Sequence, residues 1–327
     1  MPVMTYREAL NQALREEMQR DDSVFLMGED IGSFEGAYKV TQGLLSEFGP
    51  RRVKDAPIAE EGFVGAGIGA AMVGLRPVIE IMTVNFILVA IDQVVNNAAK
   101  ISYMFGGQAT VPLVIRTPGG GGHQLGAQHS QSFEHWFANV PGLKVVAPAT
   151  PADAKGMLKT AIRDDNPVMF MENLALYNTR GEVPEGEYTI PFGLAEVKRP
   201  GRDLTIVAHS RMTMVALEAA NRLADNGVEA EIVDLRSLRP LDLDTVIESV
   251  QRTNRALVIE EAWPTFGASA ELAAAISEYA FDYLDAPVKR VGSVDVPMPY
   301  AKVLERATIP SVDDVMRAAN QLLGRKA

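Results

Sequence analysis

Solid apolar runs alternate with amphipathic stretches over the first half of the chain. Thr5 and Glu8 form a capping box that predicts the start of a helix. This helix has an apolar stripe at helical spacing, formed by Tyr6, Ala9, Leu10, Ala13, Leu14 and Met18. Strands are predicted at 24–27, 52–55, 77–82, 111–115, 143–147 and 168–171, and helices at 41–48, from Glu60 onward, 85–104, 131–138 and 151–164. Apolar strands that alternate with helices indicate a parallel sheet covered on both faces.

The same alternation resumes after a change of character. Residues 173–202 are rich in Asn, Gly, Pro and Glu without a sustained period, which indicates a linker. About four strands (204–208, 229–235, 256–259 and 288–291) then alternate with helices at 211–225, 242–253, 267–281 and from about 311. The predicted fold class is α/β, with two open, mostly parallel sheet domains at 1–175 and 203–327 and a linker at 176–202.

Composition narrows the class of protein. The chain of 327 residues is 47% hydrophobic and 22% charged, which is typical of a globular protein. Its net charge of −11 argues against a nucleic-acid partner, and the absence of cysteine excludes disulfides and thiolate metal sites. The apolar runs are shorter than a membrane span, and the first residues have neither a secretory nor a transit pattern. We therefore expect a cytoplasmic enzyme or enzyme subunit.

An acid pair, Glu60 and Glu61, stands between a predicted strand and a helix rich in small residues. Glycine in a helix interior costs about 1 kcal/mol per residue, so Gly62, Gly65 and Gly69 need a reason. They could let another backbone approach closely. Alternatively, an acid at such a junction is presented at the sheet edge where α/β proteins bind ligands. This stretch by itself leaves both interpretations open.

Two glycine-rich stretches do not match known phosphate-binding motifs. Residues 65–69 lack the preceding apolar strand and the spacing of a dinucleotide fingerprint. Residues 119–122 are four glycines without the Gly-Lys-Ser/Thr of a P-loop. Because four successive glycines do not suit regular structure, the run predicts a mobile loop.

Three of the four histidines, His123, His129 and His135, are six residues apart. This spacing is neither a helical i,i+4 pair nor a zinc motif, so metal binding by them is not expected. His129 directly follows the glycine run and precedes a predicted helix. It suits a proton donor or anion contact, and equally a helix-capping or surface histidine. The polar turn at 164–167 suits a simple connection between a helix and a strand.

Several segments together resemble the beta subunits of thiamine-diphosphate-dependent 2-oxo acid dehydrogenases, a transketolase-like family. They include Ile58-Ala-Glu60-Glu-Gly-Phe63, Ala127-Gln-His-Ser-Gln131 and Asp295-Val-Pro-Met-Pro-Tyr300, with further matches at 39–41, 74–77, 141–146 and 161–167. The resemblance runs from about residue 5 to the end of the chain. Residues 260–264 and 295–302 place it closest to the pyruvate enzymes, while branched-chain 2-oxo acid and acetoin relatives share most of the motifs.

The resemblance implies a pyrimidine-binding domain up to about residue 175 and a transketolase C-terminal domain from about 200. It implies an α2β2 heterotetramer with an alpha subunit, and transfer of the acyl unit from a small 2-oxo acid to a lipoyl group of a dihydrolipoyl acyltransferase core. Glu60 falls on the acid that hydrogen-bonds the aminopyrimidine of thiamine diphosphate. His129 falls on the family's active-site histidine. Ile58, Met82 and Phe86 fall on cofactor-binding positions, whereas Val89 departs from a Gln found in some relatives.

The resemblance also implies a structural potassium ion, held mostly through backbone carbonyls at Leu113, Ala161, Ile162, Asp164 and Asn166. The family binds the cofactor's pyrophosphate and Mg²⁺ through a Gly-Asp-Gly motif, which this sequence lacks. The chain is therefore expected to carry half of a site, with Mg²⁺ bound mainly by the alpha subunit. From a different class, the alternative is a catalytically silent assembly subunit. Glu60 argues against it, because a silent copy has no need of an acid there.

Overall fold

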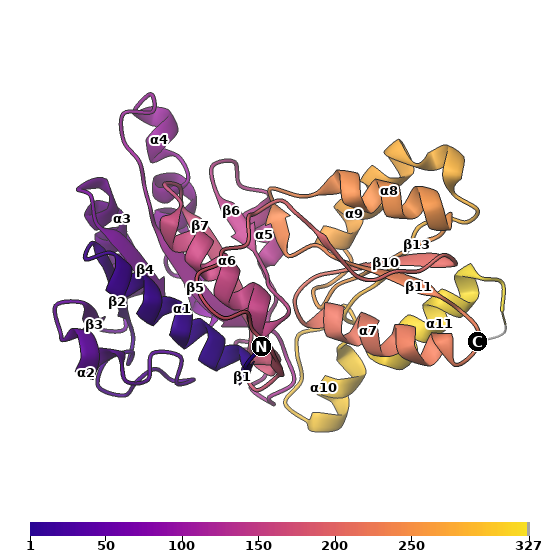
Figure 1. Cartoon of the computed structure of the whole chain (residues 1–327), viewed down its shortest axis with the longest axis horizontal. Coiled ribbons are helices and arrows are strands. Elements are labelled where there is room, and N and C mark those ends of the chain that lie inside the picture. The colour runs from indigo at the N-terminus through magenta and orange to yellow at the C-terminus, as the bar shows by residue number, and fades with distance from the viewer. Residues whose placement is uncertain (326–327) are drawn as a thin grey trace. The chain divides into compact units, whose positions relative to one another are not determined.

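A computed structural model describes residues 1–325 and divides the chain into two compact units. The first unit consists of residues 1–119 and 136–192, and the second of residues 120–135 together with the chain from 193 onward. Each unit has a mostly parallel sheet with helices packed on it, which confirms the predicted fold class (Figure 1). None of the helices within residues 1–325 is long and apolar enough to cross a membrane.

The first unit follows the predicted alternation of strands and helices. Its strands are β1 (Val3–Thr5), β2 (Val24–Gly28), β3 (Val53–Asp55), β4 (Arg76–Glu80), β5 (Val114–Gly119), β6 (Lys144–Val146), β7 (Val168–Asn173) and β8 (Arg180–Glu182). Its helices are α1 (Tyr6–Arg20), α2 (Leu44–Phe48), α3 (Glu60–Met72), η1 (Val84–Leu88), η2 (Gln93–Ala98), α4 (Ile101–Met104), α6 (Pro151–Arg163) and η3 (Leu174–Leu176), and α5 (Glu134–Ala138) crosses the boundary between the units. Thr5 caps α1 with Glu8, and the six predicted stripe residues are buried, so this helix is as expected.

The main sheet of the first unit reverses its winding at β2. Six of its strands lie parallel in the order β6-β7-β5-β4-β2-β3. The chain passes from β2 to β3 on one side and then crosses back, so that β4 and β5 extend the sheet on the other side. The carboxyl ends of β2 and β4 therefore form a topological switch point, the place where open α/β sheets bind ligands.

Two predicted elements of the first unit differ clearly in the structure. The helix expected at 85–104 is broken into η1, η2 and α4, because its hydrogen bonds widen from three residues (Ala90 N to Ile87 O, 3.0 Å) to five (Ala99 N to Val94 O, 3.1 Å). Gly142 packs so closely on the Ala99 carbonyl that tertiary contact overrides the regular helix. The strand expected at 111–115 begins instead at Val114 and runs to Gly119.

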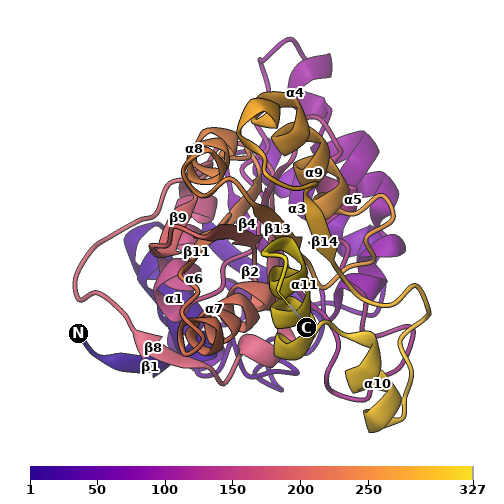
Figure 2. The ribbon, with the colours of Figure 1, turned by 90° about the vertical axis from the view of Figure 1, so that its right-hand side faces the viewer.

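The second unit contains a smaller sheet of five strands, one more than the predicted four. Its elements are β9 (Glu196–Arg199), β10 (Leu204–Ala208), α7 (Arg211–Ala224), β11 (Ala230–Asp234), β12 (Ser237–Arg239), α8 (Leu243–Thr253), β13 (Ala256–Ile259), α9 (Ala268–Tyr279), η4 (Phe281–Tyr283), β14 (Lys289–Val291), α10 (Lys302–Thr308) and α11 (Val312–Leu322). The sheet order is β14-β13-β10-β11-β9, and only β9 is antiparallel to its neighbour. Helices α7 and α11 pack against each other beside this sheet (Figure 2).

The segment 176–202, expected to be a linker, carries strands of both units. Strand β8 pairs antiparallel with β1, so that Val3 lies opposite Glu182. Strand β9 joins β11 in the second sheet. The two units meet in sequence between Phe192 and Gly193, where one assignment ends and the other begins. Polar edge strands have little apolar periodicity, and for that reason the pattern did not reveal them.

Candidate active site

Residues from three neighbouring strand ends meet at the switch point of the first sheet. Glu29 directly follows β2, Glu60 opens α3 after β3, and Met82 lies two residues beyond β4. Because β3, β2 and β4 are parallel neighbours, their carboxyl ends lie at the same edge of the sheet. The first helical position of α3 also places the Glu60 carboxyl at a helix N-terminus, which favours negative charge.

Glu29 and Glu60 form a buried pair of acids. Their side chains belong to residues that are only 5% and 4% exposed. Burial, followed by the charge of Glu60 and a hydrogen bond shared with it, raises the pKa of Glu29 to about 7. The other oxygen of Glu29, Oε1, is buried without a hydrogen-bond partner among the described residues. Such a pair can hold a proton near neutral pH, which is typical of groups that take part in acid–base chemistry.

The other predicted cofactor residues add apolar side chains to the segments that follow β3 and β4. Ile58 is 85% exposed, and Met82 and Phe86 are half-buried. Glu61 is exposed, whereas the adjacent Glu60 is buried, so the two neighbouring acids point in different directions. An exposed Ile beside buried acids is a surface suited to an apolar ring that carries polar nitrogens.

The small residues of α3 have two separate explanations. A Cβ at Gly67 would lie 2.9 Å from Ile79 Cδ1, so this glycine is required for packing of α3 on β4. A Cβ at Gly62 would approach nothing closer than 3.9 Å, and one at Gly69 would meet nothing within 4 Å. Packing within the chain therefore accounts for Gly67, while the face bearing Gly62 and Gly69 is open.

A cluster of buried charged side chains lies in the same sheet, next to the active-site edge. Arg116 on β5 donates to both oxygens of Glu172 on β7, at 2.8 and 2.7 Å, and also to Glu80 on β4. Tyr177 donates to Glu172 Oε2 at 2.5 Å. Burial acts to raise the pKa of Glu80 and outweighs the opposing charge of Arg116. Glu80 and Arg116 interrupt otherwise apolar strands, which is the one signal in the sequence that could have indicated this cluster.

His129 belongs to the second unit, in the loop that follows the glycine run. It is half-exposed, and its backbone N–H donates to the Gly126 carbonyl at 3.3 Å. The glycine run itself differs from the predicted mobile loop. Gly119 is the last residue of β5, where it lies opposite Asn173 of β7, and the following glycines make defined hydrogen bonds. Close approach to neighbouring groups therefore accounts for the glycines better than mobility does.

The five residues predicted to hold potassium lie together at the end of α6 and on the neighbouring strand connections. The carbonyls of Ile162 and Asp164 accept hydrogen bonds from Arg76 Nη1 at 3.0 and 3.1 Å. The side chain of Asp164 accepts from Lys144 and from the Asn166 amide. Leu113 O accepts the Val168 N–H at 2.8 Å, and Ala161 O accepts the Asp164 N–H at 3.3 Å. Each carbonyl oxygen has a second lone pair, but a cation bound here would have to share the carbonyls of Ile162 and Asp164 with the positively charged Arg76.

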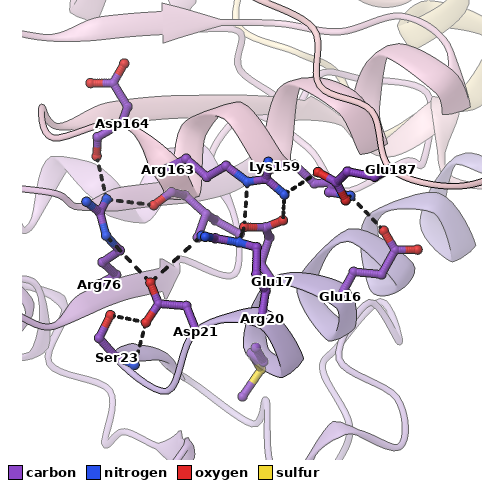
Figure 3. A network of polar contacts seen from close by, with 12 residues as sticks. Glu16, Glu17, Arg20, Asp21, Ser23, Arg76, Lys159, Arg163, Asp164 and Glu187 are labelled. Atoms are coloured by element: carbon purple, nitrogen blue, oxygen red, sulfur yellow. Dashed lines mark hydrogen bonds and ion pairs between the residues drawn. The ribbon is translucent and has the colours of Figure 1, made fainter.

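An ionic network connects this turn to the packing of α1 on α6 (Figure 3). Arg163 donates to Glu17 at 2.5 Å, and Lys159 donates to Glu187 at 2.5 Å and to Glu16 at 2.9 Å. Arg76 continues the network from Asp21 to the carbonyls at the end of α6. The acids in this region therefore have cations beside them.

Comparison with known proteins supports the predicted family resemblance over nearly the whole chain. Residues 3–179 match the transketolase pyrimidine-binding domain family, and residues 193–315 match the transketolase C-terminal domain family. The chain is 52% identical over 322 residues to the pyruvate dehydrogenase E1 component subunit beta-2, mitochondrial, of Oryza sativa subsp. japonica, covering 97% of this chain and 86% of that one. It is 51% identical over 319 residues to the pyruvate dehydrogenase E1 component subunit beta of Rickettsia felis, covering 98% of each.

A solved structure described as a split gene transketolase, inactive beta4 tetramer, has a TM-score of 0.80 against this chain. The two are 25% identical, and the likeness covers 99% of each chain. The predicted resemblance is thus confirmed by domain families, by full-length relatives and by fold. The chain belongs to the transketolase-like family of pyruvate dehydrogenase E1 component beta subunits.

Proposed function

We propose that this chain is the beta subunit of a pyruvate dehydrogenase that decarboxylates pyruvate and passes the acetyl unit to a lipoyl group of an acyltransferase core. The observation that carries the proposal is the buried pair of Glu29 and Glu60 at the switch point. Burial and two neighbouring acids raise the pKa of Glu29 to about 7, so this edge holds a proton near neutral pH. A stable fold gains nothing from a carboxyl group with a raised pKa, whereas proton transfer at a bound ring can use one.

Thiamine diphosphate fits the residues at this edge. The unpartnered Oε1 of Glu29 and the exposed Ile58 leave both a polar and an apolar contact to be filled. Glu60 would hydrogen-bond the pyrimidine ring, with Ile58, Met82 and Phe86 against its faces. When bound, thiamine diphosphate supplies a nucleophilic carbon for attack on the 2-oxo carbonyl. Glu60 would hold the proton exchanged with the ring, and His129 would supply a proton during acetyl transfer.

According to this proposal, the enzyme is active only when an alpha subunit joins the chain in an α2β2 assembly. The sequence has no Gly-Asp-Gly motif, and its net charge of −11 does not favour binding of a pyrophosphate by this chain alone. The open face of α3 at Gly62 and Gly69 is suited to close approach by a partner backbone. The similar solved structure is described as an inactive beta4 tetramer, which supports the inference that such chains need a partner.

Reconstitution tests the proposal. The purified chain alone should self-associate, bind thiamine diphosphate weakly and release no carbon dioxide from pyruvate. Addition of the alpha subunit should restore tight Mg²⁺-dependent cofactor binding and decarboxylation together. Calorimetry that shows micromolar, Mg²⁺-dependent binding to this chain alone would contradict the half-site assignment. A higher kcat/KM for branched-chain 2-oxo acids or acetoin than for pyruvate would contradict the proposed substrate.

A further inference from the structure

One carboxylate collects three hydrogen bonds from the segment that leads into the His129 loop. Glu305 Oε1, on α10, accepts the backbone N–H groups of Gly122 and Gln124 at 2.9 and 3.0 Å. Its Oε2 accepts the Gln124 side-chain amide at 2.7 Å. Glu305 and the whole of this segment belong to the second unit, although 181 residues of sequence separate Gln124 from Glu305.

Glu305 is fully buried, so its carboxylate is held by these bonds and not by water. Burial acts to raise its pKa, but the hydrogen bonds from Gln124 and Gly122 outweigh burial and keep the pKa below its usual value. Hydrogen bonds from neutral donors to a charged acceptor are stronger than those between neutral groups. The segment is thus attached to α10 by charge-assisted bonds.

Close packing also attaches this loop to residues before and after Glu305. A Cβ at Gly121 would lie 2.8 Å from Ile309 Cδ1 and 2.9 Å from Met298 Cε. Gly126 has a φ of +79°, and a Cβ there would lie 2.5 Å from the Tyr300 ring. Both glycines therefore allow the loop to lie directly on residues 298–309, the stretch that carries Glu305.

Glu261 and Arg211 provide a second anchor at Gly121. The Gly121 N–H donates to Glu261 Oε1 at 2.7 Å, and Arg211 Nη1 donates to the Gly121 carbonyl at 2.9 Å. The loop is also closed at its base, because the Gly120 N–H donates to the Gln131 carbonyl at 2.9 Å. His129 stands inside this closed loop, so the position of its backbone depends on how the loop is held.

We propose that Glu305 is a positioning residue, which fixes the loop at 120–131 on α10 and thereby places His129 for acetyl transfer. The inference rests on the proposed function, in which His129 supplies a proton. A misplacement of about 1 Å can reduce a rate roughly 100-fold, so a loosened loop should slow the step that needs His129 without abolishing cofactor binding.

The test uses the enzyme assembled with its alpha subunit and the following variants. Glu305→Gln removes the charge that strengthens all three bonds, and its amide can bond the Gln124 side chain only if that side chain turns and gives up its bond to the Gly122 carbonyl. The paired variant, Glu305→Gln with Gln124→Glu, restores the side-chain bond with donor and acceptor exchanged. His129→Ala reports the contribution of the histidine itself. Glu278→Gln, at an exposed position of α9, is the matched control.

Acetyl transfer to a free lipoyl domain should fall roughly 10–100-fold in Glu305→Gln, with the KM for pyruvate unchanged. Amide hydrogen exchange should rise within residues 120–131 only, and the paired variant should recover most of both properties. The control should match the unchanged enzyme. Glu305→Asp keeps the charge on a shorter side chain, so its rate of acetyl transfer should lie between those of the unchanged enzyme and Glu305→Gln. It provides a second test should Glu305→Gln fold poorly.

The outcomes separate the two claims. Wild-type transfer and exchange in Glu305→Gln, with His129→Ala slow, would overturn the positioning role and leave the proposed function intact. Wild-type transfer in His129→Ala would overturn the role of the histidine, and the positioning role with it. Loss without recovery in the paired variant, or increased exchange across the whole second unit, would show a general loss of folding and would overturn the inference.

Discussion

Two of the places where the first unit buries acids differ in their neighbours. Between α1 and α6, Glu17 is fully buried and accepts hydrogen bonds from Arg20 and Arg163 (Figure 3). At the switch point, Glu29 is almost as deeply buried, but the neighbours that shift its pKa, Glu60 and Asp30, are acids. The same residue type is therefore matched by cations in one place and opposed by like charge in the other.

The difference separates structural charge from functional charge. Hydrogen bonds from Lys159 and Arg163 lower the pKa of Glu187, despite an opposing contribution from burial, so the charged form suits the folded state. The pKa of Glu29 is raised to about 7, so its charged form is less favoured in the folded state than in the unfolded chain. An acid of that kind lowers stability, and its presence is explained when the site uses the proton.

The largest expected effect is on catalysis by the acid pair. In the assembled enzyme, Glu60→Gln should lower turnover roughly 10²–10⁴-fold, because the amide cannot exchange the proton. The cofactor should still bind, since the proposed function assigns its pyrophosphate to the other subunit. The measurement is steady-state decarboxylation beside calorimetric binding. Glu61→Gln, at the adjacent exposed position, is the control and should be mild. Similar losses in both variants would mean that Glu60 has been assigned wrongly.

A substitution in the ionic network between α1 and α6 should lower stability and leave catalysis unchanged. Glu17→Gln removes the negative charge and one of the two oxygens that accept from Arg20 and Arg163, and should lower the free energy of unfolding by about 1–3 kcal/mol. Urea denaturation measures this, and activity per folded enzyme should not change. Glu218→Gln is the matched control, because its pair with Arg222 is exposed on both sides and contributes little. An activity loss in Glu17→Gln without a stability loss would invalidate the comparison.

The pH dependence of stability sharpens the contrast. Between about pH 4.5, the ordinary pKa of a glutamate, and about pH 7, folded Glu29 keeps a proton that the unfolded chain has released. Unfolding then releases a proton, so stability should fall as pH rises through this range. Glu29→Gln should flatten that part of the profile and raise stability at pH 8. Thermal melting from pH 4 to 9 would show it, and an unchanged slope would contradict the raised pKa.

The smallest expected effect is that of potassium on the melting temperature, through the turn at the end of α6. If the carbonyls of Ile162 and Asp164 hold a cation beside Arg76, potassium should raise the melting temperature by roughly 2–4 °C relative to tetramethylammonium at equal ionic strength. Such a shift corresponds to about 1 kcal/mol of binding linkage. Equal melting temperatures in the two salts would mean that Arg76 and Lys144 already satisfy this turn.

Local pattern was sufficient for much of the fold. The box of Thr5 and Glu8, the buried stripe of α1 and the strand Ala256–Ile259 depend on residues close in sequence, and the structure has them where they were expected. The broken helix at 85–104 and the fixed glycine run depend on contacts from distant residues, Gly142 and Glu305. A periodic pattern has no information on such partners.

The site divides in the same way. Glu60 stood out because an acid pair precedes a glycine-rich helix, and its assignment also required a family resemblance. Glu29 was not recognised, because an acid after a strand is ordinary and its partner lies 31 positions away. Only the reversal of strand order at β2 brings the two together. Partial sites of this kind become visible once the order of strands is known.

The second unit is assembled from two separate stretches of chain, residues 120–135 and residues from 193 onward. A ribosome makes the His129 loop long before it makes Glu305, which follows Gln124 by 181 residues. The nascent loop therefore has no partner during most of synthesis, and contacts across such long separations form late because the intervening chain must first be ordered. The bonds between this loop and α10 can therefore form only after synthesis has passed Glu305. A domain exchange between relatives that moves residues 193–327 alone would replace the platform and leave behind the loop that was matched to it.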